Sequence, residues 1–391
     1  MYPRFLPELK FSDISSALLN NVSYSELGDL LSRKVLGSEK GKRLAFFNSG
    51  RGAIYHILKQ LNVKKVYVQG YICCSVYKAI QLAKKEIIPL DITLRNYGID
   101  VDTLENKLEE GSVIILSHLY GIPCDIEDIK QIARQKKCIV IEDACAAYGS
   151  SYRGIPVGNF GDIAVISFDF SKTLTASRGG AAVLNNNKYG YIFDQFEQKV
   201  NDKFIDLYSI KALTEGVMFN VLNTSILYKW LILNLVFKKN RPYTDSGKYD
   251  LVYDTYFNKG ISGVRRSILY RQLMRFNKIC QRKREIGELY YKELSNVNTI
   301  HLFECNKNEM PILITFPFLL KEKDRLKVYH QFKQKGVDLG WSYSYILGNS
   351  QDAELTNCFY ASERMLNLPL YSKLSVDDAG RIIEITKRIL S

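Results

Sequence analysis

The sequence predicts an α/β fold: a mostly parallel, seven-stranded type of sheet with helices on both faces, followed by a smaller α+β domain. Over roughly the first half of the chain, short β-branched and apolar runs alternate with amphipathic segments. Beyond about residue 264, long amphipathic helical patterns replace this alternation. The 391 residues, of which 46% are hydrophobic, are enough for a large core and two domains.

The alternation begins with an apolar run at 44–47, followed by a helix at 53–61 whose apolar residues have helical spacing. Further strands are expected at 65–68, 86–90, 112–117, 138–142, 163–168 and 180–184, with helices at 75–84, 101–108 and 126–136, the last capped by Asp125. The carboxyl ends of parallel strands meet at one edge of a sheet. The turns at Ser49, Tyr71, His118, Asp143 and Lys172 should therefore converge.

The later chain predicts a helix over 265–295, a strand over 310–318, and helices over 321–335 and 376–390. We therefore expect a large domain at 1–250 and a small domain at 251–391. The large domain would carry an apolar helical insertion near 190–250. Within it, residues 217–237 are unusually apolar, yet polar residues interrupt them too often for a comfortable membrane span. A helix in the core or in an oligomer interface is favoured; a helix at a membrane surface and a true span stay open.

Two strand ends carry the residues that suggest chemistry. Lys172 follows the strand at 163–168, and Asp143 ends the strand that precedes it. A lone lysine is most often a solvated loop residue. An amine and a carboxylate at neighbouring strand ends, however, are what pyridoxal phosphate needs: the amine bonds to the cofactor, and the carboxylate keeps its pyridine nitrogen protonated.

The turn before the first helix, Ser49-Gly50-Arg51-Gly52, can present backbone amides and the positive end of a helix dipole to a phosphate. Taken alone, such a turn is more often only a helix cap.

Composition limits the partners and the compartment. The net charge of +13 favours anionic partners, but the basic residues are scattered and no nucleic-acid motif is present. The eight cysteines contain no CxxC pair, and the four histidines have no metal-ligand spacing. Reduced cysteines and a start without a signal-peptide layout lead us to expect a cytoplasmic protein.

Several motifs follow one another in a fixed order: His118-Leu119-Tyr120-Gly121, Glu142-Asp143-Ala144, residues 157–162, Ser167-Phe168 with Lys172, and residues 363–370. This ordered set resembles the DegT-type sugar aminotransferases, pyridoxal phosphate enzymes of the aspartate aminotransferase fold type I that act on nucleotide-linked keto sugars. The similarity runs from about residue 44 to 184 and returns in the C-terminal part.

The resemblance implies a role for several residues. Lys172 would bond to the cofactor and act as the acid and base, and Asp143 would pair with the pyridinium nitrogen. The backbone of Gly50, Arg51 and Gly52, with the Ser167 hydroxyl, would hold the phosphate. Counting back from Gln272-Leu273 places the family's asparagine, which the partner subunit contributes, at Asn258. This would make the homodimer obligatory, whereas as a turn residue Asn258 would need no such role.

Four positions depart from the family pattern. Ala146 stands where a glutamine is usual, Arg51 where a threonine is usual, and Arg178 where an acidic residue is usual. Cys73 aligns with the aromatic residue that often stacks on the cofactor, which leaves Tyr71 as the substitute. These changes bear on substrate preference more than on the chemistry.

The sequence thus predicts transfer of an amino group, with glutamate as donor, to a keto-deoxysugar on a nucleotide diphosphate, for surface polysaccharide or glycan biosynthesis. The alternatives are a pyridoxal phosphate-dependent sugar dehydratase or isomerase, and a membrane-peripheral scaffold that has lost activity. Lys172 argues against the family's dehydratase branch, which carries histidine there. Ala146 and residues 217–237 motivate the scaffold, because they suggest an altered cofactor site and a membrane contact.

Overall fold

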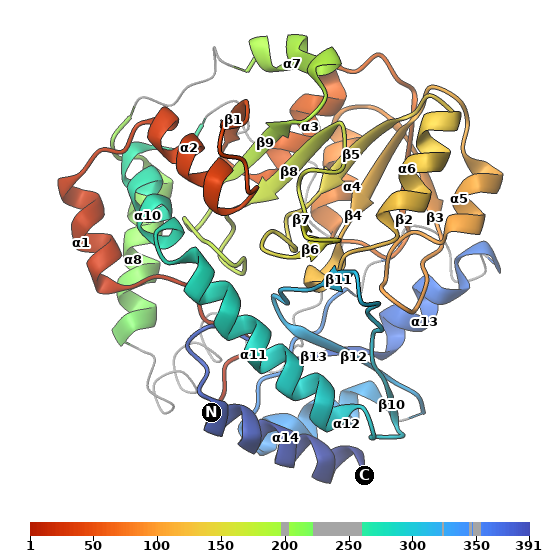
Figure 1. Cartoon of the computed structure of the whole chain (residues 1–391). Helices are drawn as coiled ribbons and strands as arrows, with labels where there is room; N and C mark the ends of the chain where they lie inside the picture. Colours follow the sequence, from red (N-terminus) through yellow and green to blue (C-terminus); the bar gives the residue numbers. More distant parts are fainter. Residues whose placement is uncertain (197–202, 222–259, 323, 344–345, 347–352) are drawn as a thin grey trace.

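The computed structural model describes the chain except residues 197–202, 222–259, 323, 344–345 and 347–352 (Figure 1). Its centre is a seven-stranded sheet with strand order β1-β9-β8-β5-β4-β2-β3. The strands are β1 (Leu44–Phe47), β2 (Lys65–Gln69), β3 (Glu86–Leu90), β4 (Val113–Ser117), β5 (Ile139–Asp143), β8 (Ile163–Ser167) and β9 (Gly180–Leu184). β9 runs antiparallel to both of its neighbours, β1 and β8, and the other four strand pairs are parallel, so the sheet is mostly parallel, as predicted.

Both faces of this sheet are covered because its strands are apolar on both sides. On one face, Val66 and Val68 of β2 pack with residues of α3 (Gly50–Gln60) and α4 (Cys74–Leu82). On the other face, Tyr67 packs with residues of α5 (Val101–Lys107) and α6 (Ile126–Gln135). Further along that second face, β8 and β9 pack against α2 (Tyr24–Lys34), α10 (Gly263–Leu273) and α11 (Phe276–Leu294).

The C-terminal part builds a second, antiparallel sheet of β10 (Ile300–His301), β12 (Phe316–Leu320) and β13 (Met365–Leu368). α12 (Arg325–Gln334) packs with β13, and α14 (Val376–Leu390) packs with α12 and α11. The remaining elements are α1 (Phe11–Leu19), η1 (Leu119–Gly121), β6 (Ser151–Tyr152), β7 (Ile155–Pro156), η2 (Asn187–Tyr189), α7 (Gly190–Asp194), α8 (Leu207–Val221), β11 (Glu309–Met310), η6 (Ala353–Leu355) and α13 (Thr356–Arg364).

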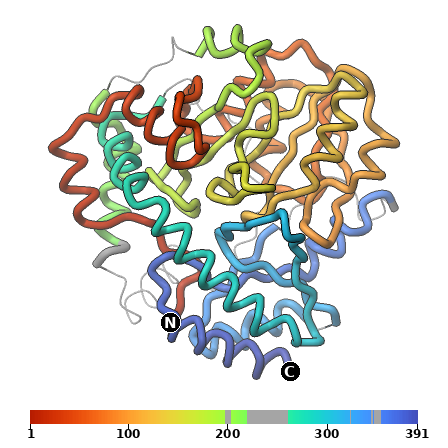
Figure 2. Tube along the Cα trace, viewed as in Figure 1, coloured from red at the N-terminus to blue at the C-terminus, as the bar shows by residue number. Residues whose placement is uncertain are grey.

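The N-terminal segment lies against this C-terminal part (Figures 1 and 2). The Tyr2 amide donates to the Gly336 carbonyl at 2.7 Å. Arg4 then makes two 2.8 Å hydrogen bonds to the Asp338 carboxylate, and both side chains are buried. A buried ion pair with this two-point geometry fixes where the segment runs.

Three predictions about elements are wrong in detail. The helix expected over 265–295 is two helices, α10 and α11, which meet at Met274 and Arg275. Arg275 at this break binds Asp13 at 2.6 Å, a contact from far away in the chain that no local pattern contains. The strand expected over 310–318 is likewise two short strands, β11 and β12. Asp125 precedes α6 but makes no capping hydrogen bond, because its carboxylate pairs with Arg95 and Asn96.

The predicted domain division at residue 250 falls among residues that the structure does not describe, so it stays a prediction.

Candidate active site

A cavity of about 840 Å³ opens where the parallel strands end. Residues that follow β4, β5 and β8 line it, together with the first residues of α3 and α4. A second set of lining residues comes from the C-terminal part, and Arg4 and Phe5 come from the N-terminal segment. The predicted meeting of strand ends is therefore seen for Ser49, His118, Asp143 and Lys172.

Asp143, the last residue of β5, is almost completely buried and faces this cavity. Ser117 at the end of β4 donates its hydroxyl to Oδ2 at 3.1 Å, and the Cys145 amide donates to Oδ1 at 3.0 Å. Each oxygen of a carboxylate can accept two hydrogen bonds. Asp143 is thus held in place and keeps acceptor capacity toward the cavity.

The neighbouring carboxylate, Glu142, points to the opposite face of the strand and has a structural role. It accepts hydrogen bonds from the amides of Gly158, Phe160 and Gly161 at 2.6 to 2.9 Å, and His118 Nε2 lies 3.2 Å away. Burial alone would raise the pKa of Glu142, but these hydrogen bonds lower it. Its charge therefore anchors the loop at 158–161 beneath the site.

Lys172 lies in the loop between β8 and β9 and lines the same cavity as Asp143. Its amide donates to the Asp169 carbonyl at 3.0 Å, and the Phe168 amide closes the base of the loop on the Gly179 carbonyl at 2.8 Å. Among the described residues, no carboxylate forms an ion pair with the Lys172 ammonium. The amine is therefore available to a ligand in the cavity.

The start of α3 forms a cradle that can hold an anion. A Cβ added at Gly50 would lie 3.1 Å from the Ser167 Cβ and 3.1 Å from the Cys145 Sγ, so a larger residue would push the helix and β8 apart by a few tenths of an ångström. Within the described chain, the amides of Gly50 and Arg51 have no protein acceptor. These two amides and the Ser167 hydroxyl can hold a phosphate.

Gly52 was predicted to share this role, and the structure does not support that. Its amide donates to Ser49 Oγ at 3.0 Å as the N-terminal cap of α3, and Gly52 does not line the cavity. The cap uses the third amide of the helix, so the first two remain for a ligand.

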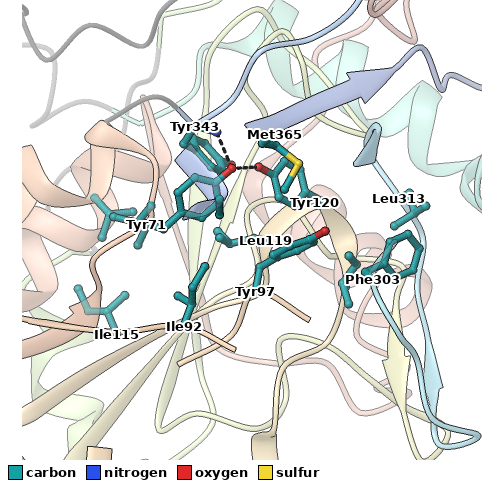
Figure 3. Close-up of a cluster of buried hydrophobic side chains, with 14 of the residues drawn as sticks. Tyr71, Ile92, Tyr97, Ile115, Leu119, Tyr120, Phe303, Leu313, Tyr343 and Met365 are labelled. Carbon is teal, nitrogen blue, oxygen red and sulfur yellow. Dashed lines mark hydrogen bonds between the residues drawn. The ribbon is translucent and has the colours of Figure 1, made fainter. Parts of the chain in front are cut away.

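Tyr71 is not in the cavity wall either, and its expected place beside the cofactor ring stays a prediction. The turn after β2 buries it completely, and its hydroxyl lies 2.5 Å from that of Tyr120 and accepts from the Tyr343 amide at 2.9 Å. Figure 3 shows the three tyrosines packed together. Cys73, which aligns with the aromatic residue that often stacks on the cofactor in the family, does line the cavity wall.

The other three residues that depart from the family pattern also line the cavity: Arg51, Ala146 and Arg178. Cys145 also lines it; burial and the Asp143 carboxylate raise the pKa of its thiol, which therefore stays protonated near neutral pH.

Other wall residues were not predicted from the sequence. Ser117 ends a strand, so the strand-end rule could have found it. Phe5 reaches the cavity because Arg4 is tied to Asp338, and its ring packs at 5.4 Å against Phe170. The wall residues of the C-terminal part include Thr315, Trp341, Ser342, Tyr343 and Asn367.

Taken together, these residues fit pyridoxal phosphate: a held carboxylate, an amine that forms no ion pair with a described residue, and an anion cradle line one cavity. Asn258 and residues 222–237 of the apolar stretch lie outside the described residues. Among the helices that are described, none is long and apolar enough to cross a membrane.

Comparisons with known proteins agree with this site. The model of the DegT/DnrJ/EryC1/StrS aminotransferase family matches residues 40–204 and 238–387. The protein MJ1066 of Methanocaldococcus jannaschii is 24% identical over 379 residues, which cover 92% of this chain and 88% of that one. GDP-perosamine synthase of Escherichia coli O157:H7 is 38% identical over 143 residues, which are 36% of this chain and 39% of that enzyme.

Solved structures match over nearly the whole chain. The sugar aminotransferase CalS13 from Micromonospora echinospora has a TM-score of 0.74 at 18% identity, covering 99% of this chain and 100% of that one. Spr1654 from Streptococcus pneumoniae in its PLP form has a TM-score of 0.74 at 20% identity, covering 100% and 99%. These likenesses confirm the predicted fold class.

Proposed function

Because the chain belongs to the DegT/DnrJ/EryC1/StrS aminotransferase family, we propose that it transfers an amino group from glutamate to a keto-deoxysugar carried by a nucleotide diphosphate. The cofactor of this aminotransferase is pyridoxal phosphate. The observation that carries the proposal is that Asp143 and Lys172, from two neighbouring strand ends, line one cavity with an anion cradle.

When bound, pyridoxal phosphate supplies a carbonyl that takes up an amine and a ring that withdraws electrons from the adjacent carbon. Asp143, oriented by Ser117 and the Cys145 amide, would hold the ring nitrogen in its protonated form. Lys172 would anchor the cofactor and carry the proton to and from the amine-bearing carbon. The Gly50 and Arg51 amides and Ser167 would hold the phosphate.

The relatives, the volume of the cavity and the net charge of the protein support the sugar substrate. Partial matches include GDP-perosamine synthase and, at 30% identity over 106 residues, the dTDP-4-dehydro-2,6-dideoxy-D-glucose 3-dehydratase of Saccharopolyspora spinosa. The cavity volume of about 840 Å³ is in the upper part of the range for small-molecule sites. A net charge of +13 favours a diphosphate ligand.

A role in polysaccharide synthesis has a similar basis. The lipopolysaccharide biosynthesis protein RfbH of Salmonella typhimurium is 32% identical over 113 residues, which are 28% of this chain and 26% of that protein. We place the aminated sugar of this enzyme among the precursors of a surface polysaccharide or another glycan.

The direct test is to incubate the purified full chain with L-glutamate and a panel of GDP- and dTDP-linked 4-keto-deoxysugars, and to analyse the sugars by mass spectrometry. We expect the keto oxygen of one sugar to be replaced by an amino group, in a reaction that requires glutamate. Loss of water without amination would instead support the dehydratase. No change in any sugar would contradict amino transfer in this panel.

We further propose that the enzyme is a cytoplasmic homodimer in which Asn258 of one protomer completes the site of its partner. Mixing inactive Lys172→Ala with inactive Asn258→Ala subunits should restore part of the activity, because one site in a mixed dimer would then carry both residues. The membrane scaffold makes a different prediction. If it were right, the wild type would float with liposomes and a variant without residues 217–237 would not.

A further inference from the structure

Arg51 in the first turn of α3 has a buried polar atom that the protein does not satisfy. Its Nη2 donates to the Ser75 hydroxyl at 3.0 Å. Its Nε is buried, and among the described residues it has no hydrogen-bond partner. A buried donor without an acceptor costs about 1 to 3 kcal/mol, so such atoms in native proteins call for an explanation.

The surroundings of Arg51 favour an anion near its guanidinium. Arg51 and Ser75 both line the cavity, and they belong to the first turns of α3 and α4. Two helix N-termini, each with a positive dipole end, therefore meet at the guanidinium. Within the part of the chain that the structure describes, no carboxylate forms an ion pair with Arg51. This corner is positive, and no ion pair with a described residue neutralises it.

The backbone of Arg51 places its side chain beside the anion cradle. The preceding residue, Gly50, approaches Ser167 so closely that an added Cβ would lie 3.4 Å from the Ser167 hydroxyl oxygen. The amides of Gly50 and Arg51 are available at the same point, whereas the Gly52 amide is taken by the cap. A phosphate in this cradle would receive two amides and one hydroxyl, and Arg51, whose own amide belongs to the cradle, can add a full positive charge to them.

We propose that Arg51 binds the cofactor phosphate through its side chain and supplies the positive charge of this phosphate site, with Ser75 holding the guanidinium in position. This inference rests on the proposed pyridoxal phosphate site and adds a residue-specific role to it. Arginine suits the task because its rigid fork of donors matches phosphate geometry. The guanidinium, which belongs to a residue of the cavity wall, would then donate to a phosphate oxygen.

The test compares two cofactor forms that differ only in the phosphate. Full-chain protein freed of cofactor is titrated with pyridoxal phosphate and, separately, with pyridoxal, and binding is followed by absorbance. For Arg51→Ala we expect the Kd for pyridoxal phosphate to rise about 10- to 100-fold, while the Kd for pyridoxal changes less than about threefold. Arg51→Lys should keep the charge and lose the fork, so its Kd should rise less than that of Arg51→Ala.

Two further variants make the result specific. Arg153→Ala removes an exposed arginine that pairs with Glu127, and it should leave both Kd values unchanged. Ser75→Ala removes only the hydroxyl that holds the guanidinium, and it should weaken pyridoxal phosphate binding by less than Arg51→Ala does.

Equal weakening of both cofactor forms in Arg51→Ala would overturn the proposal, because it would assign Arg51 a structural role. Unchanged Kd values for both forms would also overturn it and would leave Arg51 facing the substrate. Failure of the proposed function gives a different result: the wild type would then bind neither form at Lys172.

Discussion

The two walls of the cavity differ in how the chain builds them. The strand-end wall consists of Asp143, Ser167, Lys172 and the start of α3, and it stands on the adjacent strands β5 and β8. The C-terminal wall contains Thr315, residues 341–343 and Asn367, which come from distant parts of the chain. The strand-end wall carries the groups that fit the cofactor. We infer that the C-terminal wall selects the substrate, because the side chains named here are uncharged polar and aromatic ones.

The largest expected effect tests the strand-end wall. Lys172→Ala removes both the anchor of the cofactor and the proton carrier, so amino transfer should fall by about 10⁴-fold or more. The rate is measured as amino-sugar formation by mass spectrometry. Lys172→Arg is the matched control: it keeps the positive charge and should be equally inactive, because a guanidinium does not give up its proton. Activity above about a tenth of wild type in either variant would contradict this role.

The second prediction separates the two neighbouring carboxylates of β5. Asp143→Asn removes the charge that faces the cavity, so kcat should fall about 10²- to 10³-fold, with little change in the thermal unfolding midpoint. Glu142→Gln should do the opposite. Its carboxylate accepts hydrogen bonds from three backbone amides, so the substitution should lower the free energy of unfolding by about 3 kcal/mol and leave the cofactor spectrum intact.

Calorimetry and steady-state rates on the two variants distinguish these effects. If Glu142→Gln lost activity at full stability, the assignment of a structural role to Glu142 would be wrong.

The third prediction concerns Lys283, which lies behind the cavity and contacts a neighbour in sequence of Lys172 and a residue near Thr315. Its Nζ lies 3.3 Å from Thr173 Oγ1, beside Lys172, and 3.3 Å from the Leu313 carbonyl. Burial lowers the pKa of Lys283 to about 8, against about 10.4 in the unfolded chain. Between these values the unfolded state binds a proton that the native state lacks, so the free energy of unfolding should rise with pH.

Below pH 8 Lys283 is charged in the native protein as well as in the unfolded chain. The full free-energy cost of burying this ammonium then lowers the stability of the native state. Lys283→Met should therefore stabilise the protein by about 2 kcal/mol at pH 7, and this gain should shrink as the pH rises toward 10. Urea unfolding at several pH values measures the difference. A gain that does not change between pH 7 and pH 10 would show that the Lys283 charge is not its source.

The smallest effect tests the C-terminal wall. Asn367 is completely buried in β13, and among the described residues its Oδ1 has no hydrogen-bond partner. If this oxygen contacts the sugar, Asn367→Ala should raise the KM for the sugar about tenfold. The spectral change that L-glutamate alone produces should keep its wild-type rate. Slower reaction with glutamate would place Asn367 with the cofactor groups instead.

The same contrast explains what could be predicted from the sequence. Strand periodicity gave β3 and β9 with their bounds, and the strand-end rule then brought Asp143 and Lys172 together. Such signals are local, and a parallel sheet places its strand ends at one edge. Tyr71 shows the limit of this rule, because which way a turn directs its side chain depends on packing against Tyr120 and Tyr343.

The C-terminal wall could not be predicted because it depends on long-range contacts. Asn367 pairs with Gly340 across a β-bridge, and Phe5 is placed by the ion pair of its neighbour Arg4 with Asp338. The break between α10 and α11 has the same origin, since Arg275 binds Asp13. None of these contacts leaves a periodic or spacing signal in the sequence.

One measurement tests the central claim, that Lys172 and Asp143 share one pyridoxal phosphate, most directly. The purified protein is reduced with borohydride and digested, and the peptides are analysed by mass spectrometry; Asp143→Asn is treated in parallel. We predict a phosphopyridoxyl group on Lys172 alone, and in Asp143→Asn a label at the same lysine with a shifted cofactor absorbance before reduction. A label on another lysine such as Lys283, or an unchanged absorbance in Asp143→Asn, would contradict the account.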